Sequence, residues 1–255
     1  MIFLTEEDKS KIQYNGLYRV DLSSGSYYVK NTGNSGAFRE LFGKKIIDIV
    51  GILSPEYLYI KDKNCILSSD LNQTYKRFIF ASQLDDITNI NVLYESLKQF
   101  KNYKELITSV NIMHFIDTLF CNTDRHSDNY GFAINEDNTA RLVVLDNELM
   151  LEDFTCATRP VSFPTHSHVI YRSYSKECEY KYFLDTLSDE QKLLIFYLLK
   201  KLDLKTVYSI MNSLERENNC KFKNKFFLKY VKNYIMLCKC TMLESKKNTR
   251  IKKER

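Results

Sequence analysis

The strongest constraint in this chain is a polar run at residues 122–129, NTDRHSDN, which is followed directly by two strand-like segments. Residues 130–134 (YGFAI) and 141–145 (RLVVL) are apolar enough for strands, and residues 135–138 (NEDN) between them favour a turn. A hairpin brings its two ends together, so the polar run should lie beside Asp146, which follows the second strand. The chain is therefore predicted to fold around a hairpin that presents acidic and amide side chains at one end.

Three side chains of this hairpin have the chemistry that phosphoryl transfer requires. The reaction needs a carboxylate beside the acceptor hydroxyl, and oxygen ligands that hold Mg²⁺ against the nucleotide phosphates. Asp124 fits the first role, while Asn129 and Asp146 supply the hard oxygen atoms that Mg²⁺ prefers. The alternative is an ordinary polar hairpin whose Asp and Asn residues only cap and turn the chain, because short motifs of this kind recur by accident.

A lysine and a glutamate earlier in the chain form a second pattern. Residues 27–30 (YYVK) are strand-like and end in Lys30. Apolar residues at helical spacing between positions 38 and 50 then predict a helix that carries Glu40. In phosphotransferases a strand lysine contacts the phosphates, and a glutamate on the next helix orients it through an ion pair. Taken singly, Lys30 is an ordinary strand-end lysine and Glu40 a surface glutamate, but their order favours the functional interpretation.

The order of these residues, with NTD-x-H-x-x-N as its most specific part, resembles that of the HipA-like (CtkA-like) serine/threonine protein kinases, bacterial relatives of the protein kinases. The resemblance implies an α+β, two-lobed protein-kinase-like fold. A small β-rich N-terminal lobe with one helix is expected at residues 1–70. A larger, mainly helical C-terminal lobe, with the catalytic loop and the metal-binding hairpin, is expected at residues 71–255.

Carried across position by position, the resemblance implies that Asp124 is the catalytic base and that Asn129 and Lys30 complete the catalytic set. It implies Asn129 and Asp146 as Mg²⁺ ligands, and Lys30 with its partner Glu40 as the contacts to the ATP phosphates. The segment predicted to meet the adenine edge, as a hinge between the lobes, consists of Ser68, Ser69, Asp70 and Leu71. A plain loop is the alternative for that segment.

The activity implied is ATP- and Mg²⁺-dependent transfer of the γ-phosphate to a serine or threonine of a protein substrate, with an antitoxin or regulatory partner in some members of the family. Two alternatives stay open. Phosphoinositide lipid kinases also carry an Asp-Arg-His-x-x-Asn string, and a non-catalytic nucleotide-binding or partner-binding module would keep the same scaffold.

Several positions near the predicted site are ambiguous. No G-x-G-x-x-G precedes Lys30, so the position of the phosphate loop is open. Gly25 fits the turn of a hairpin, and Gly33 and Gly36 after the lysine fit either a flexible connection to the helix or a loop over the phosphates. Arg125 is expected to steady an acidic or phosphorylated group, or to form a surface ion pair. A structural role, through hydrogen bonds to the loop backbone or to the metal-ligating aspartate, is expected for the histidine of the motif.

Composition narrows the class of protein. With 44% hydrophobic and 27% charged residues the chain suits a globular protein, and no stretch approaches the roughly 18 apolar residues of a membrane span. The seven cysteines are dispersed and odd in number, which predicts reduced thiols and a cytoplasmic protein. A substrate-facing role is predicted for the irregular residues 151–180. The basic end at 246–255 is expected to be a solvated terminus, and neither membrane association nor direct nucleic-acid binding is expected.

Overall fold

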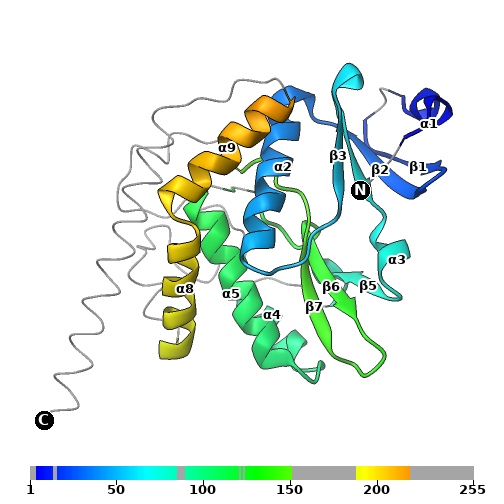
Figure 1. Cartoon of the computed structure of the whole chain (residues 1–255). Helices are drawn as coiled ribbons and strands as arrows, with labels where there is room; N and C mark the ends of the chain where they lie inside the picture. The colour runs from blue at the N-terminus through cyan, green and yellow to red at the C-terminus, as the bar shows by residue number, and fades with distance from the viewer. Residues whose placement is uncertain are drawn as a thin grey trace, which may run out of the picture.

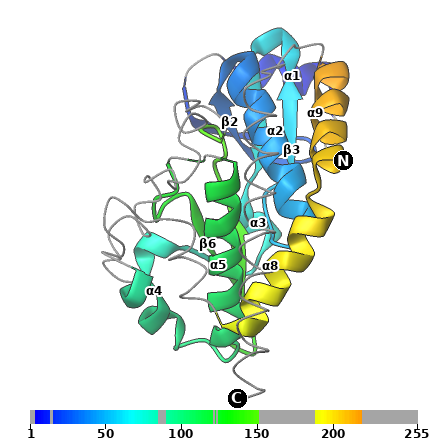
Figure 2. The same ribbon diagram turned by 90° about the vertical axis from the view of Figure 1, so that its left-hand side faces the viewer.

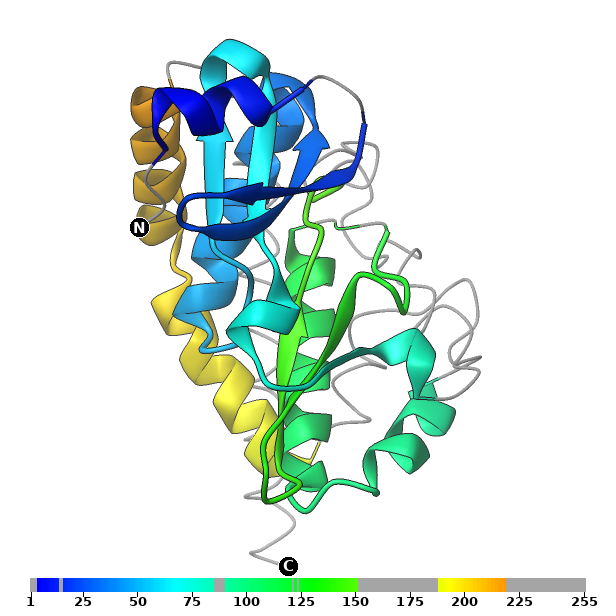
Figure 3. The same cartoon turned by 90° about the vertical axis from the view of Figure 1, so that its right-hand side faces the viewer.

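The structure is a computed structural model that describes residues 4–13, 16–84, 90–120, 122, 124–150 and 188–218. These residues form two lobes, each built on one antiparallel sheet (Figure 1). Figure 3 shows the four-stranded sheet in one lobe and the three-stranded sheet, with the helices beside it, in the other. The predicted substrate-facing segment at 151–180 and the basic end at 246–255 lie outside the described residues.

The four-stranded sheet has the order β1-β2-β4-β3. Its strands are β1 (Tyr18–Leu22), β2 (Gly25–Asn31), β3 (Tyr57–Ile60) and β4 (Cys65–Ser69). Gly25, with φ +136°, lies at the β1–β2 turn, which confirms the hairpin predicted there. Alternation along β2 buries Val29 and leaves Tyr28 and Lys30 on the opposite face, where Lys30 pairs in register with Ile66. The lysine is thereby fixed in the middle of the sheet.

A short helix that the sequence pattern did not predict, α1 (Glu6–Lys11), packs against β1. Its start is a capping box, in which Thr5 Oγ1 accepts from Asp8 N and Asp8 Oδ2 accepts from Thr5 N, both at 3.0 Å. Asp8 also accepts from the backbone N–H of Ser23 at 2.8 Å, so the buried carboxylate ties the helix to the β1–β2 turn.

Helix α2 (Gly33–Ile49) begins directly after β2 and carries Glu40 on a buried face, as predicted. It starts at Gly33, five residues before Phe38, where the predicted apolar pattern begins. Figure 2 shows helix α9 (Leu204–Asn218) running alongside α2, and the two are in contact. The helix that carries Glu40 is therefore held by the sheet of its own lobe on one side and by the last described helix on the other.

The second lobe contains the predicted hairpin. Strands β6 (Tyr130–Ile134) and β7 (Ala140–Val144) pair in register, with Tyr130 opposite Val144. The edge strand β5 (Phe78–Phe80), which was not predicted, completes the three-stranded sheet. The remaining elements are η1 (Lys61–Lys63), α3 (Leu71–Thr74), η2 (Ala81–Gln83), α4 (Ile90–Leu97), α5 (Tyr103–Leu119) and α8 (Asp189–Lys201).

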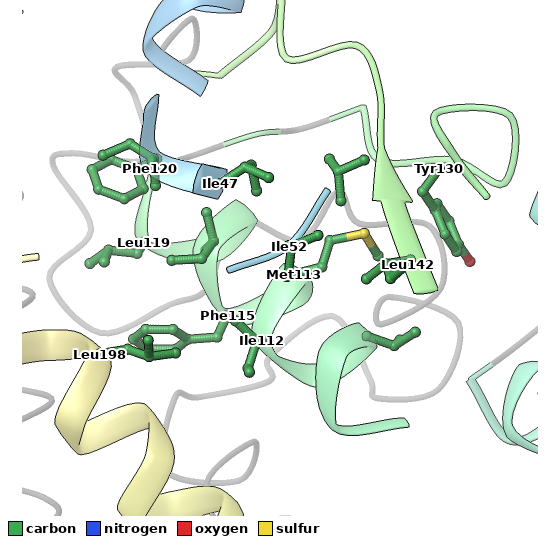
Figure 4. Close-up of a cluster of buried hydrophobic side chains, with 14 of the residues drawn as sticks. Ile47, Ile52, Ile112, Met113, Phe115, Leu119, Phe120, Tyr130, Leu142 and Leu198 are labelled. Carbon is green, nitrogen blue, oxygen red and sulfur yellow. The ribbon is translucent and has the colours of Figure 1, made fainter. Parts of the chain in front are cut away.

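One hydrophobic cluster joins the two lobes. Figure 4 shows part of it, where Ile47 of α2 lies near Phe120, which follows α5, and where Leu142 of β7 and Leu198 of α8 take part. Leu53, after α2, adds to the edge of β7, because Val144 N donates to its carbonyl at 2.8 Å. The position of Glu40 relative to the hairpin is therefore set by the main core.

Candidate active site

A pocket of about 300 Å³ opens between the two lobes. Its lining includes all of the residues predicted for metal and nucleotide contacts: Lys30, Glu40, Ser68, Ser69, Asp70, Leu71, Asn129 and Asp146. Side chains that the sequence did not single out complete it: Leu17, Tyr28, Tyr57, Ile66, Asn72, Phe78, Phe80, Asp128 and Leu145. Segments more than 100 residues apart in the chain thus meet in one cavity.

The unpredicted residues make one part of the pocket apolar. Tyr28 and Ile66 come from the four-stranded sheet, while Phe78, Phe80 and Leu145 come from the other lobe. Apolar walls from two sides with a few polar groups at the edge are typical of sites for flat ligands. Tyr28 lies two residues before Lys30 on the same strand face, so the period of two along a strand was a signal that pointed to it.

The predicted hinge lines the pocket, but the fold uses part of its backbone. Ser69 N donates to Glu56 O at 2.9 Å, and Asp70 N donates to Ser26 O at 3.1 Å. Asp70 is also the N-cap of α3, and its side chain accepts from Asn72 N. Leu71 is the first residue of that helix, where a backbone N–H has no intrahelical partner. Within the predicted hinge, the contact to the edge of an adenine ring is therefore assigned to the backbone N–H of Leu71, at the start of α3.

Lys30 lies among carboxylates at the opposite end of the pocket. Its Nζ is 2.7 Å from Asp146 Oδ2 and 3.5 Å from Glu40 Oε1. Burial by itself would lower the pKa of Lys30, but the charges of Glu40 and Asp146 outweigh it and raise that pKa above its usual value. The lysine is therefore a fixed positive charge at any physiological pH, and the predicted Lys30–Glu40–Asp146 convergence is observed.

Glu40 and Asp146 are affected differently by the same surroundings. Burial, reinforced by the charge of Asp146, raises the pKa of Glu40 to about 7 against the opposing charge of Lys30. Burial would also raise the pKa of Asp146, but its close contact with Lys30 lowers it. Asp146 is thus the ionised member of the pair, as a metal ligand must be.

The chain after Asp146 docks on a face of α2 that carries glycines. Asn147 N donates to Glu40 Oε2 at 2.7 Å. A Cβ added at Gly43 would overlap the side chain of Asn147, and one at Gly36 would come within 2.7 Å of Glu148 Oε1. Gly36 is thus a helical residue that leaves space for Glu148, where the sequence suggested a flexible connection or a phosphate loop. In the sequence, the signal for this close approach was a pair of glycines seven residues apart, a spacing that places both on the same face of a helix.

Arg125 is fully buried, so the surface ion pair considered for it is wrong, and the acidic group that it steadies is the buried carboxylate of Asp117. Its Nε and Nη2 each donate to a carboxylate oxygen of Asp117 in α5, both at 3.0 Å. Nη2 also donates to Asn147 Oδ1 at 2.8 Å, and Nη1 donates to Asn129 O at 2.9 Å. A single guanidinium therefore joins α5, the loop after it and the chain that follows β7.

The same guanidinium supports an unusual backbone at the predicted metal ligand. Asp146 has φ +44°, a left-handed conformation that residues other than glycine rarely adopt. Nη1 of Arg125 donates to Asp146 O at 3.2 Å and to Leu145 O. Together with the bond from Asn147 to Glu40, these contacts fix the turn that directs the Asp146 side chain at Lys30.

Asn129 is oriented so that its amide oxygen is available. Its Nδ2 donates to Asp124 O at 2.7 Å, which leaves Oδ1 without a protein partner among the residues that the structure describes. Within that part of the chain no three His, Cys, Asp or Glu side chains group closely enough to hold a metal ion. Mg²⁺ takes one or two protein ligands and completes its shell with phosphate oxygens and water, so Asn129 and Asp146 fit such an ion.

Asp124 is on the same loop but outside the pocket lining, with 44% of its side chain exposed. His126 lies between two acids, with Nε2 3.8 Å from Asp124 Oδ2 and Nδ1 3.7 Å from Asp128 Oδ2. Asp128 N donates to His126 Nδ1 at 3.3 Å, which agrees with the structural role expected for this histidine. The carboxylate of Asp124 is therefore open to a solvent-borne acceptor.

No protein-family model matches the chain, and no curated protein matches its sequence. Its fold is similar to the crystal structure of the Helicobacter pylori proinflammatory kinase CtkA, with a TM-score of 0.61 over 94% of this chain and 95% of that chain. The two sequences are 18% identical, so the similarity is one of fold. The chain has a two-lobed, kinase-like fold, as predicted, while membership of the HipA-like group stays a prediction.

Proposed function

We propose that this chain is an ATP- and Mg²⁺-dependent protein kinase that transfers the γ-phosphate to a serine or threonine of a protein substrate. The observation that carries the proposal is the meeting of Lys30, Asn129 and Asp146, from three separate segments, in one pocket between two lobes. The kinase-like fold supports it. In an ordinary polar hairpin, nothing would require Lys30 and Asp146 to lie together in a pocket.

In this proposal each part of the pocket has a distinct task. The apolar walls around Tyr28 and Phe78 bind the adenine ring, and the N–H of Leu71 donates to its edge. Lys30 binds phosphate oxygens, and the amide oxygen of Asn129 with the carboxylate of Asp146 would hold Mg²⁺. That ion, when bound, neutralises charge on the transferring phosphoryl group. Both lobes contribute to each end of the pocket, since Tyr28 and Lys30 come from β2 while Phe78, Asn129 and Asp146 come from the other lobe.

The proposed base is Asp124, because its exposed carboxylate is on the loop whose other end supplies Asn129. It would accept the proton of the acceptor hydroxyl as the phosphoryl group arrives. Asn129 Nδ2 binds the backbone carbonyl of Asp124, so the base and the metal ligand are fixed relative to each other.

Phosphate transfer from γ-labelled ATP tests the assignment. Asp124→Asn should lower the transfer rate by about 10²–10⁴-fold, the usual contribution of a positioned acid or base. Asp146→Asn should lower transfer as well and should raise the Mg²⁺ concentration needed. Asp62→Asn removes an exposed carboxylate of η1 and serves as the matched control. Label transfer that survives both site substitutions would remove the assignment.

A panel of acceptors then separates the classes of kinase. Transfer to serine or threonine of proteins, including the chain itself, supports the proposal, whereas transfer only to phosphoinositide vesicles would move the chain to the lipid kinases. A thermal shift with ATP and Mg²⁺ but no transfer to any acceptor would favour a non-catalytic nucleotide-binding module. None of the helices in the described part of the chain is long and apolar enough to span a membrane.

The remaining expectations stay predictions from the resemblance. These are the antitoxin or regulatory partner, the cytoplasmic location, the absence of direct nucleic-acid binding and the lobe boundary at residue 71. Phosphosite mass spectrometry after expression in cells, with Asp124→Asn as the inactive control, would identify the substrate class.

A further inference from the structure

A third carboxylate, which the sequence did not single out, contacts the proposed phosphate-binding lysine. Glu148 Oε2 lies 2.7 Å from Lys30 Nζ, the same distance as Asp146 Oδ2. The Glu148 side chain is 25% exposed, so solvent reaches it. Lys30 is thus shared by two close carboxylates and by the more distant Glu40.

Glu148 is held in this position by contacts on both sides. Its backbone N–H donates to Asp146 Oδ1 at 3.2 Å, and its carbonyl accepts from Arg39 Nε of α2. Its side chain packs where Gly36 lacks a Cβ, since a Cβ there would lie 2.7 Å from Oε1 and 3.2 Å from Cγ. The contact with Lys30 is therefore part of the packing of the chain onto α2.

Among the residues that the structure describes, few positive charges lie at this end of the pocket. Arg125 directs its donors at Asp117, at Asn147 and at backbone carbonyls, so it offers none to a ligand. Of the described residues that line the pocket, Lys30 is the one cation, and carboxylates surround it. A triphosphate entering without a cation would meet this excess of negative charge, because like charges repel strongly where water is partly excluded.

Asp146 and Glu148 differ in what they can do when a nucleotide arrives. In the proposed function Asp146 would hold Mg²⁺ and so would keep an ionic partner after losing Lys30. Glu148 is held against α2 at Gly36 and Arg39, whereas the other proposed metal ligand, Asn129, binds the backbone carbonyl of Asp124. Glu148 must then leave Lys30 when phosphate oxygens bind there.

We propose that the carboxylate of Glu148 occupies the position beside Lys30 at which a phosphate oxygen of the nucleotide would bind. We further propose that the charge of Glu148 makes nucleotide binding depend on a divalent cation. This inference rests on the proposed function, since it takes Lys30 as the phosphate contact. Mg²⁺ supplies the charge that offsets the carboxylates. Without Mg²⁺ the repulsion from Glu148 and its competition for Lys30 keep the nucleotide out.

The test is the ratio of ATP affinities measured with Mg²⁺ and with EDTA by titration calorimetry on the full chain. Glu148→Gln keeps the shape of the side chain and removes its charge, so the metal-free affinity should rise about tenfold and the ratio should fall. Glu148→Asp keeps the charge and should retain most of the metal dependence. The control, Glu95→Gln, removes an exposed charge on α4 that pairs with Lys98, and it should leave both ATP affinities and their ratio unchanged.

The outcomes separate this inference from the proposal beneath it. If the wild-type chain binds no ATP even with Mg²⁺, the proposed function fails. If the wild-type chain binds ATP and Glu148→Gln leaves the ratio unchanged, the inference alone fails. If Glu148→Gln weakens binding in Mg²⁺ and raises the Mg²⁺ concentration required, Glu148 is a metal ligand and the inference is overturned.

Discussion

Lys30 and Arg125 are two cations of the site, and both contact Asp146. Oxygen atoms surround each of them, but the two side chains differ in how firmly these oxygen atoms are held. Arg125 is fully buried and divides its donors among Asp117, Asn147 and backbone carbonyls. Lys30 is 26% exposed, and its partners among the described residues are the carboxylates of Glu40, Asp146 and Glu148. Backbone carbonyls cannot move away without unfolding the turn, whereas the partly exposed carboxylates of Asp146 and Glu148 can rotate. The comparison suggests that one cation holds the site together and the other is available to a ligand.

The largest effect should come from removing the buried cation. Arg125→Met keeps much of the side-chain length but leaves the Asp117 carboxylate buried without its partner, which should lower the free energy of unfolding by about 3–5 kcal/mol. Urea denaturation followed by circular dichroism measures it. The double variant Arg125→Met with Asp117→Asn should recover part of the loss, because no unpaired charge then remains. A loss below about 1 kcal/mol in the single variant would contradict the conclusion that Arg125 holds the site together.

Lowering the pH should also destabilise the buried region around Arg125. Burial and the charge of Arg125 lower the pKa of His114 in α5 to about 3. Between that value and its unfolded pKa near 6.5, the unfolded state binds the extra proton. His114 therefore contributes stability that is complete above pH 6.5 and is lost as the pH falls, by about 1.4 kcal/mol per pH unit.

Denaturation of the wild-type chain and of His114→Gln between pH 4.5 and 7 tests this. The difference in unfolding free energy between the two should change with pH, because the glutamine does not titrate. A difference that stays constant across this range would show that the fold accepts the imidazolium, and that the surroundings of Arg125 are less closed than their burial indicates.

The contact between α2 and the chain after Asp146 gives a third, intermediate effect. Gly43→Ala places a methyl group against Asn147, and overpacking of this kind costs about 1–3 kcal/mol. Because Asn147 accepts from Arg125 and donates to Glu40, the substitution should also weaken nucleotide binding. Lys45→Ala, an exposed change on the same helix, is the control. Equal thermal stability of the two variants would contradict the docking described for Asn147.

The sequence was sufficient for those parts of the site that depend on local periodicity and order. A hairpin must join its ends, so the nearness of residues 122–129 and Asp146 followed from the strand pattern. The strand-like run and the helical spacing after it placed Lys30 and Glu40 on neighbouring elements, and the order of such residues in kinases predicted that they pair. These relations involve one element and its neighbour, where side-chain direction follows from secondary structure alone.

The parts that were missed depend on how distant elements pack. Arg125 has polar neighbours in the sequence, and its burial follows from Asp117, an acid among the apolar residues of α5. That isolated acid was the only local signal for a buried ion pair. The three-residue strand β5, which carries Phe78 and Phe80, was too short for its alternation to be recognised. Tertiary contacts decide such positions, and no period in the sequence encodes them.

The smallest effect on stability, and the sharpest test of the comparison, comes from the exposed cation. Lys30→Met removes a charge whose close partners, Asp146 and Glu148, are 35% and 25% exposed and can turn to water. Its cost to stability should therefore be smaller than that of Arg125→Met, whose partner Asp117 is fully buried and cannot turn to water.

The same substitution should nevertheless remove ATP binding, because Arg125 has its donors directed into the fold and cannot replace Lys30. Calorimetric titration with ATP and Mg²⁺, next to a urea denaturation curve of the same sample, separates the two effects. Near-native stability without ATP binding identifies Lys30 as the ligand-facing cation. A loss of stability as large as that of Arg125→Met would mean that both cations maintain the fold, and the division of roles between them would fail.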